Sequence, residues 1–183
     1  MVTLDAKQMK QLTKALADIK DGVPKVIVPA INRALASGQT TVRREIRKIY
    51  LIKQKDIPTK LHRARYASPT GHVRIDQGML TADKFVYRPK VRTARRRDLF
   101  VQIKKTGGGV VKRGFVTNRM GEGPFQRRSA APRLPIRKVV AIGAAIMASQ
   151  PTVGPAANEV MGDTLAKRID HELKRVLASA GGK

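Results

Sequence analysis

The chain contains no cysteine and no tryptophan, and aromatic residues make up only 4% of its 183 residues. Without cysteine there can be no disulfide framework, no thiol nucleophile and no cysteine-ligated zinc. The scarcity of aromatic residues predicts a core of aliphatic side chains and alanine. The hydrophobic content of 42% is high enough to predict a folded chain of one domain rather than a disordered basic tail.

Long hydrophobic runs are absent as well. The best apolar run, residues 139–148, falls well short of the roughly 20 residues that cross a bilayer. The first twelve residues are amphipathic and include Asp5, unlike the basic and then apolar start of a secretory signal. We therefore expect a soluble protein that neither spans a membrane nor leaves the cell by the general secretory route.

Acidic residues are few. Lys and Arg number 38 against 13 Asp and Glu, so the formal net charge is +25, far more than solubility requires. More than half of this excess lies between Lys84 and Lys138, where 17 basic residues stand beside only Asp98 and Glu122. Such a concentration of one sign predicts a polyanionic or acidic partner.

Apolar residues recur at helical spacing in three segments. Amphipathic helices are therefore expected over residues 4–21, 23–50 and 156–179. Pro29 lies inside the second segment, so this helix is expected to start afresh or bend there. The stripe of Ile31, Leu35, Val42 and Ile46 is expected to pack on a sheet. A short helix is also expected over 56–65, which has a proline near its beginning.

Between residues 72 and 128, apolar and basic residues alternate in short segments separated by Gly or Pro, which predicts antiparallel hairpins. The expected strands are 72–76, 84–88, 99–104, 110–116 and 125–128. Turns are expected at 68–71, 107–109 and 121–123, because proline and glycine favour them. The predicted fold class is α+β, with long N-terminal helices and a C-terminal helix packed on a small antiparallel sheet of hairpins that carries a basic loop.

The segment 89–98 crowds four arginines together with almost nothing apolar to bury, which predicts a loop tip. Together with its flanking bases it is the candidate site for an anion, either DNA or an acidic protein partner. A charge run of this kind is equally typical of a solvated surface, and charge alone does not distinguish these cases. The candidate residues are Arg88, Lys90, Arg92, Arg95, Arg96, Arg97, Arg127 and Arg128.

No pattern of residues nominates catalytic chemistry. His62, His72 and His171 stand apart, and none has a second ligand at the spacing of a helical metal site. The serines sit in no nucleophile pattern, and Asp76 and Asp83 are expected to cap turns. The three-glycine run lacks the ending of a phosphate-binding loop. We expect no enzyme, no metal and no cofactor.

Several segments together resemble the prophage minor tail protein Z family, the tail-completion proteins of long-tailed bacteriophages. The resemblance spans about residues 21–177, and its most telling piece is Ala30-Ile31-Asn32-Arg33-Ala34. The other pieces are Val23-Pro24, residues 42–47 (VRREIR), the arginines at 95–97, residues 114–116 (GFV), 125–128 (FQRR) and 134–136 (LPI).

The resemblance implies a non-catalytic structural protein of the virion. It would be assembled in the host bacterial cytoplasm and lie at the head-proximal end of the tail, where tail and head join. Its partners would be other tail and neck proteins, such as a tail terminator and a head–tail connector, copies of itself in a ring, and the genomic DNA in the channel. One domain over 1–183 is expected, with a helical part (1–66), a basic hairpin part (67–140) and a second helical part (141–183).

A non-specific nucleic-acid-binding protein of the nucleoid or ribosome is the alternative, because it would share this composition. State of assembly distinguishes the two, since a nucleoid protein acts as a monomer or dimer on free DNA. A nuclease is a third reading, but it requires clustered carboxylates for Mg²⁺, and the few acids are scattered.

Overall fold

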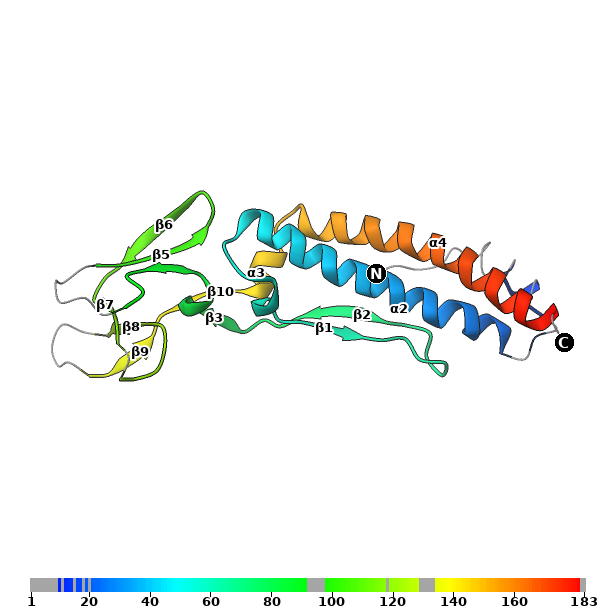
Figure 1. The fold of residues 1–183 in the computed structure, drawn as a ribbon, viewed down its shortest axis with the longest axis horizontal. Coiled ribbons are helices and arrows are strands. Elements are labelled where there is room, and N and C mark those ends of the chain that lie inside the picture. Colours follow the sequence, from blue (N-terminus) through cyan, green and yellow to red (C-terminus); the bar gives the residue numbers. More distant parts are fainter. Residues whose placement is uncertain are drawn as a thin grey trace. The chain divides into compact units, whose positions relative to one another are not determined.

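A computed structural model describes residues 10, 12–14, 16, 17, 19, 21–91, 98–117, 119–128 and 134–181. Helices and short antiparallel strands both occur (Figure 1), so the α+β class is confirmed. The helices are α2 (Gly22–Ile49), α3 (Ala144–Ala148) and α4 (Val153–Gly181). The strands are β1 (Thr59–His62), β2 (His72–Ile75), β3 (Met79–Thr81), β4 (Val86–Arg88), β5 (Leu99–Lys104), β6 (Gly107–Val111), β7 (Gly114–Val116), β8 (Pro124–Arg127), β9 (Ile136–Lys138) and β10 (Val140–Gly143). No described helix is long and apolar enough to cross a bilayer.

The chain divides into two compact units. The helical unit comprises Met1–Val42, Thr59–Arg74 and Pro151–Lys183, and the strand unit comprises Arg43–Pro58 and Ile75–Gln150. The boundary falls within α2, so a single helix contributes residues to both units. That the chain forms one domain stays a prediction.

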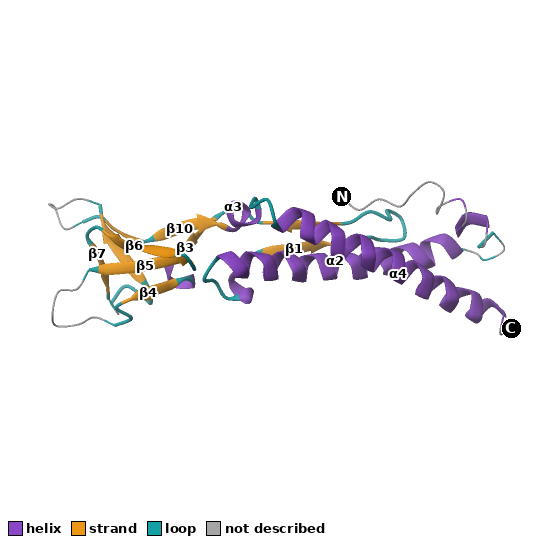
Figure 2. Cartoon of the chain, turned by 90° about the horizontal axis from the view of Figure 1, so that it is seen from above, coloured by secondary structure: helices purple, strands orange, loops and turns teal. Residues whose placement is uncertain are grey.

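In the helical unit, α2 and α4 lie side by side and run antiparallel (Figures 1 and 2). Their apolar stripes meet in one aliphatic core, so here the helices bury their apolar faces against each other. The predicted second and last helices are confirmed, and α2 continues through Pro29. The core residues are Leu12, Leu16, Val26, Ile27, Ala30, Ala34, Leu165, Ile169 and Val176, with Ile31 and Leu173 packed against them.

The two helices approach each other closely at Gly38. A Cβ placed on Gly38 would lie 2.4 Å from both Cγ and Sδ of Met161 on α4, closer than real Cβ contacts allow. The absence of a side chain at this position therefore permits the approach.

Two amide side chains of α2 hold the segment around β1. Asn32 Nδ2 donates to the carbonyl of Ala64 at 3.1 Å, and the Ala64 N–H donates back to Asn32 Oδ1 at 2.8 Å. Gln39 Nε2 donates to both the carbonyl and the hydroxyl of Thr59, at 3.1 and 3.0 Å. These bonds satisfy extended backbone that pairs with β2.

The helix predicted over 56–65 is wrong. A short 3-10 turn, Gln54–Asp56, is followed by β1 in its place. Ten residues that include a proline are marginal as an isolated helix. The extended form is stabilised by its pairing with β2 and by the hydrogen bonds from α2.

In the described part of the strand unit there are three small antiparallel sheets, with strand orders β10-β3, β4-β5-β6 and β7-β8-β9. Together with β1-β2, the described strands are divided among four sheets, where the sequence suggests one. Alternate residues of β4 and β5 point inward, as half-buried strands require. Their core contains Ala82, Tyr87, Leu99, Val101, Val116 and Val139.

The glycine triplet at 107–109 lies in β6, so its prediction as a turn is wrong. The turn consists of Lys105 and Thr106, and β6 lies at one end of the order β4-β5-β6. A Cβ on Gly108 would lie 2.6 Å from Cζ of Phe100, so glycine leaves room for that ring. The turn predicted at 121–123 has positive φ at Gly121 (93°) and Gly123 (116°), which glycine accepts without strain.

The strands predicted at 72–76, 99–104 and 125–128 are confirmed to within a residue or two. The strand predicted over 84–88 begins only at Val86, and the one over 110–116 is broken by a turn at Lys112 and Arg113. The turn predicted at 68–71 lies earlier, between the bridged residues Arg65 and Ser68. Most of the helix predicted over 4–21 lies outside the described residues.

Candidate functional site

Four of the eight candidate anion-binding residues lie in the described part of the chain, all in the strand unit. Arg88 ends β4 and Lys90 follows it, while Arg127 ends β8 and Arg128 follows it. The structure thus places them as two pairs on two different sheets. The other four, Arg92, Arg95, Arg96 and Arg97, lie outside the described residues.

The pair at the end of β4 is anchored by an aromatic ring. Lys90 Nζ lies 3.7 Å from the ring centroid of Tyr87, a cation–π contact. The pKa of the Tyr87 hydroxyl is raised, first by burial and then by the nearby carboxylates of Asp83 and Glu122. The ring therefore stays neutral, and its face holds the Lys90 ammonium.

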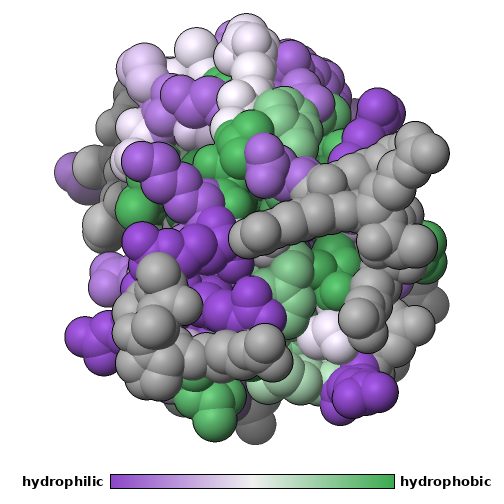
Figure 3. Space-filling view, turned by 90° about the vertical axis from the view of Figure 1, so that its left-hand side faces the viewer, coloured by the Kyte–Doolittle hydropathy of each residue, from purple (hydrophilic) through white to green (hydrophobic). Residues whose placement is uncertain are grey.

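The pair at the end of β8 is held differently. The Arg127 guanidinium lies 4.8 Å from the ring centroid of Phe115, and its buried Nε has no hydrogen-bond partner among the described residues. The carbonyl of Arg128 accepts a hydrogen bond from Arg113 Nη1 at 3.2 Å, and the Arg128 side chain is exposed. Figure 3 shows one face of the molecule, on which hydrophilic side chains are interrupted by apolar patches.

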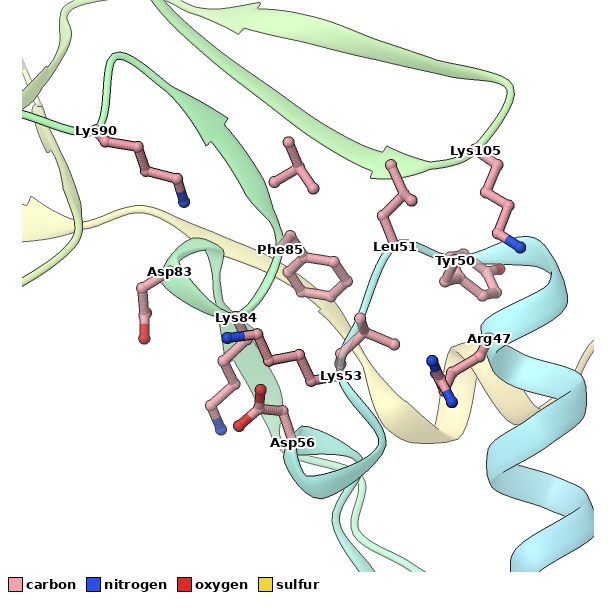
Figure 4. Close-up of a pocket in the computed structure, with 12 residues that line it drawn as sticks. Arg47, Tyr50, Leu51, Lys53, Asp56, Asp83, Lys84, Phe85, Lys90 and Lys105 are labelled. Atoms are coloured by element: carbon pink, nitrogen blue, oxygen red, sulfur yellow. The ribbon is translucent and has the colours of Figure 1, made fainter.

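The structure adds a cavity of about 380 Å³ in the strand unit (Figure 4). We call it the basic pocket, because five of its lining side chains are cationic and two are acidic. Lys90 is the one described candidate residue that lines it. The lining residues are Arg47, Tyr50, Leu51, Ile52, Lys53, Asp56, Asp83, Lys84, Phe85, Val86, Lys90 and Lys105.

Backbone hydrogen bonds fix the frame of the basic pocket. The Leu51 N–H donates to the Ile103 carbonyl at 2.8 Å, and the Lys105 N–H donates to the Ile49 carbonyl at 3.0 Å. The buried Tyr50 hydroxyl accepts a hydrogen bond from Gln150 Nε2 at 3.1 Å. The end of α2 and the segment after it are therefore tied to β5 before any ligand arrives.

The described lining residues leave a net positive charge in the pocket. Among the described residues, none of its five cations forms an ion pair with Asp56 or Asp83. Figure 4 shows Lys53, Lys84 and Asp56 at one part of the cavity and Arg47 at another. This arrangement is suited to binding an anion.

The described residues contain no group of three or more metal-ligating side chains. The structure does bring together two histidines that the sequence leaves apart. In the helical unit, the exposed rings of His62 on β1 and His72 on β2 stack with centroids 4.4 Å apart and an interplanar angle of 12°.

A family model described as Prophage minor tail protein Z (GPZ) matches residues 6–179. The chain belongs to the prophage minor tail protein Z family. The resemblance seen in the sequence is thereby confirmed, and the protein is a phage minor tail protein with a structural role in the tail. No curated protein and no solved structure matches the chain.

The structure gives the most telling piece of the minor tail protein Z resemblance a physical meaning. In residues 30–34, Ala30 and Ala34 belong to the core between α2 and α4, and Asn32 makes the two hydrogen bonds to Ala64. Arg33 is exposed. This motif builds the fold of a tail protein rather than a reactive site.

Sequence reasoning missed four of the five cations of the basic pocket. Arg47, Lys53, Lys84 and Lys105 come from separate segments of the chain and share no spacing. Arg47 lies in the last turn of α2 and Lys53 just before the 3-10 turn Gln54–Asp56. Lys84 ends a second 3-10 turn, Ala82–Lys84, and Lys105 lies in the β5–β6 turn. Only tertiary structure brings these positions around one cavity. In this minor tail protein, the only sequence signal was the general excess of positive charge.

Proposed function

We propose that this minor tail protein completes the head-proximal end of the bacteriophage tail and contributes to the head–tail, or neck, junction. The family match over residues 6–179 carries the proposal. The net charge of +25 supports it, because that junction brings together protein rings and a DNA-filled head. The role is structural rather than catalytic, as expected of a tail protein.

The proposed partners are other tail and neck proteins, namely a tail terminator and a head–tail connector, and further copies of the chain in a ring. Genomic DNA in the channel is a further anionic surface within reach of the same place. Each DNA phosphate that the protein neutralises would release counterions, so binding would be strong and largely independent of base sequence. The proposed location is the virion, after assembly in the host cytoplasm.

The location is tested by imaging particles that carry the protein with a small fused label. The label is expected at the head-proximal end of the tail, and particles made without the protein are expected to contain separate heads and tails. A label at the distal end, or normal joining without the protein, would overturn the proposal. Finding the protein only on free DNA would favour a nucleoid protein instead.

The arginines at 92 and 95–97 are proposed to face an anion at this junction. Replacing all four with Ser should leave the melting temperature nearly unchanged while it impairs head–tail joining, because the sequence predicts a solvated loop there and such charges stabilise little. A control replaces four exposed bases of the helical unit with Gln, and its joining should remain normal. The control residues are Arg63, Arg65, Lys167 and Lys174.

The same variant identifies the anion. If the loop contacts DNA, the Ser variant should also show a flatter dependence of duplex binding on salt, with the slope reduced by about 0.9 for each lost phosphate contact. Impaired joining with an unchanged salt slope would point to an acidic subunit. Wild-type joining together with an unchanged slope would show that the loop is only a solvated charge run.

A further inference from the structure

The family match does not assign a role to the basic pocket of the strand unit. It combines three properties: a preformed cavity of about 380 Å³, cations without ion pairs inside it, and an apolar wall. We propose that the basic pocket binds an acidic peptide segment of a neighbouring tail or neck protein. The inference rests on the proposed function only in that the partner is another protein of the particle.

Charge is the first argument. Among the described residues, Arg47, Lys53, Lys84, Lys90 and Lys105 line one cavity together with two carboxylates. Like charges gathered in this way repel one another and destabilise the free protein, and an anionic ligand removes that repulsion. Charge complementarity therefore calls for a ligand with several negative groups.

The shape of the pocket selects between the two anions that a tail protein meets. Its volume lies at the small end of the roughly 300–1,000 Å³ typical of ligand sites. Duplex DNA presents its phosphates on a broad convex surface, which fits a small concave cavity less well than a peptide does. An extended peptide places individual side chains into it.

The wall of the pocket points the same way. Leu51 and Val86 contribute accessible apolar surface beside the cations, while Ile52 and Phe85 are buried behind them. Phosphate gains nothing from apolar contact, and the buried ring of Phe85 offers no stacking face to a base. A peptide that mixes carboxylates with aliphatic side chains satisfies both parts of the wall.

The bound peptide would meet a preorganised frame. The backbone bonds that tie Leu51 to Ile103 and Lys105 to Ile49 are already made in the free protein. On the side of the pocket, only the long cationic side chains need to be ordered on binding, which keeps that part of the entropic cost low.

The test uses a synthetic peptide in which Glu and Leu alternate, together with a matched peptide in which Gln replaces every Glu. Fluorescence anisotropy at low salt should show binding of the acidic peptide and little binding of the neutral one. In the Lys53→Glu/Lys105→Glu variant we expect affinity for the acidic peptide to fall about tenfold or more, because two attractive contacts become repulsive.

The matched control is Lys55→Glu/Lys112→Glu. Both control lysines are exposed in the strand unit and neither lines the pocket, so the net charge falls equally while the pocket is intact. Its affinity should change less than about threefold, as expected for charges outside the site. Conversely, Asp83→Asn should tighten binding, since it removes a carboxylate from the pocket.

Equal losses in both charge-reversal variants would overturn the proposal, as would tight binding of the neutral peptide. A loss of duplex DNA binding confined to the pocket variant would assign the pocket to nucleic acid instead. Amide chemical shifts of the wild-type protein give a measurement independent of any variant: the acidic peptide should perturb residues 51–53 and 84–86. If the acidic peptide does not bind but the label lies at the head-proximal end of the tail, only the proposal for the pocket is overturned. If the peptide binds but the label lies elsewhere, only the proposed function is overturned.

Discussion

Leu35 on α2 is buried, with 6% of its surface exposed, and its Cδ1 lies 2.5 Å from where a Cβ on Gly71 would be. It therefore fills the space between α2 and the backbone just before β2. Leu35→Ala should lower the free energy of unfolding by about 2–5 kcal/mol, because it leaves a cavity. Urea unfolding measures this, with Arg33→Ala as an exposed control on the same helix. A loss below about 0.5 kcal/mol would show that Leu35 is not part of the core.

Glu45 on α2 accepts contacts from two cations. Its carboxylate lies 2.8 Å from Lys48 Nζ and 3.5 Å from Arg44 Nε, and its side chain is 9% exposed. The hydrogen bond from Lys48 is the main reason why the pKa of Glu45 lies below its ordinary value of 4.5, although burial opposes it. The charged form is thus favoured in the folded protein.

This pKa shift predicts a pH dependence of stability. Because the folded pKa is the lower one, the contribution of Glu45 is fully present above the unfolded pKa and is lost as pH falls through the folded pKa. The difference in unfolding free energy between wild type and Glu45→Gln should be largest near pH 7 and shrink below about pH 4.5. Urea unfolding across this range checks it, and a difference that grows on acidification would contradict the assignment.

The contact between α2 and α4 depends on a small residue. An Ala at Gly38 would gain up to about 1 kcal/mol of helix propensity, but its Cβ would clash with Met161 at 2.4 Å, and overpacking costs about 1–3 kcal/mol. We expect Gly38→Ala to lower the melting temperature. Gly162→Ala on α4 is the matched control, because nothing lies within 4 Å of its Cβ position. That variant should raise the melting temperature, and the opposite order of the two variants would refute this packing.

The elements differed in how well the sequence predicted them. The long helices were predictable because a stripe repeated over seven turns or more outweighs one internal proline. The helix predicted over 56–65 failed because Gln39 and Asn32 supply hydrogen bonds that favour extended backbone there. Strands of three residues such as β3 and β9 are too short to show an alternation of apolar and polar residues. They are recognised only in the structure, from their pairing with β10 and β8.

For the molecule as a whole, charge and family were readable from the sequence and the binding geometry was not. Composition gave the excess of positive charge, and short motifs gave the minor tail protein Z family. The basic pocket has cations from α2, from the segment between α2 and the first 3-10 turn, from the second 3-10 turn and from the strand connections. No local sequence pattern predicts that these residues line one cavity.

The net charge of +25 predicts how the whole molecule meets DNA. Duplexes of the same length but different base composition should bind with affinities within about threefold of each other. Affinity should fall linearly on a log–log plot against salt, with a slope of about −0.9 per phosphate contacted. Filter binding or anisotropy measures both quantities. A preference of tenfold or more for one duplex would indicate base readout, which the sequence does not predict.

The glycine-rich strand β6 has a consequence for the order of assembly. It lies at the end of its sheet, and none of its five residues carries a charge or is a proline, so it lacks the features that keep exposed strand edges from pairing. When the chain is synthesised in excess over its partners in the particle, its copies should therefore associate through β6. The ratio in which the tail proteins are synthesised would then affect assembly as much as their affinity for one another. The apparent molar mass of the purified protein, measured by light scattering, should rise with concentration, and Val110→Lys should suppress that rise. A variant whose apparent molar mass rises as much as that of wild type would show that the β6 edge does not cause self-association. The amount of this protein then need not be matched to the amounts of the other tail proteins.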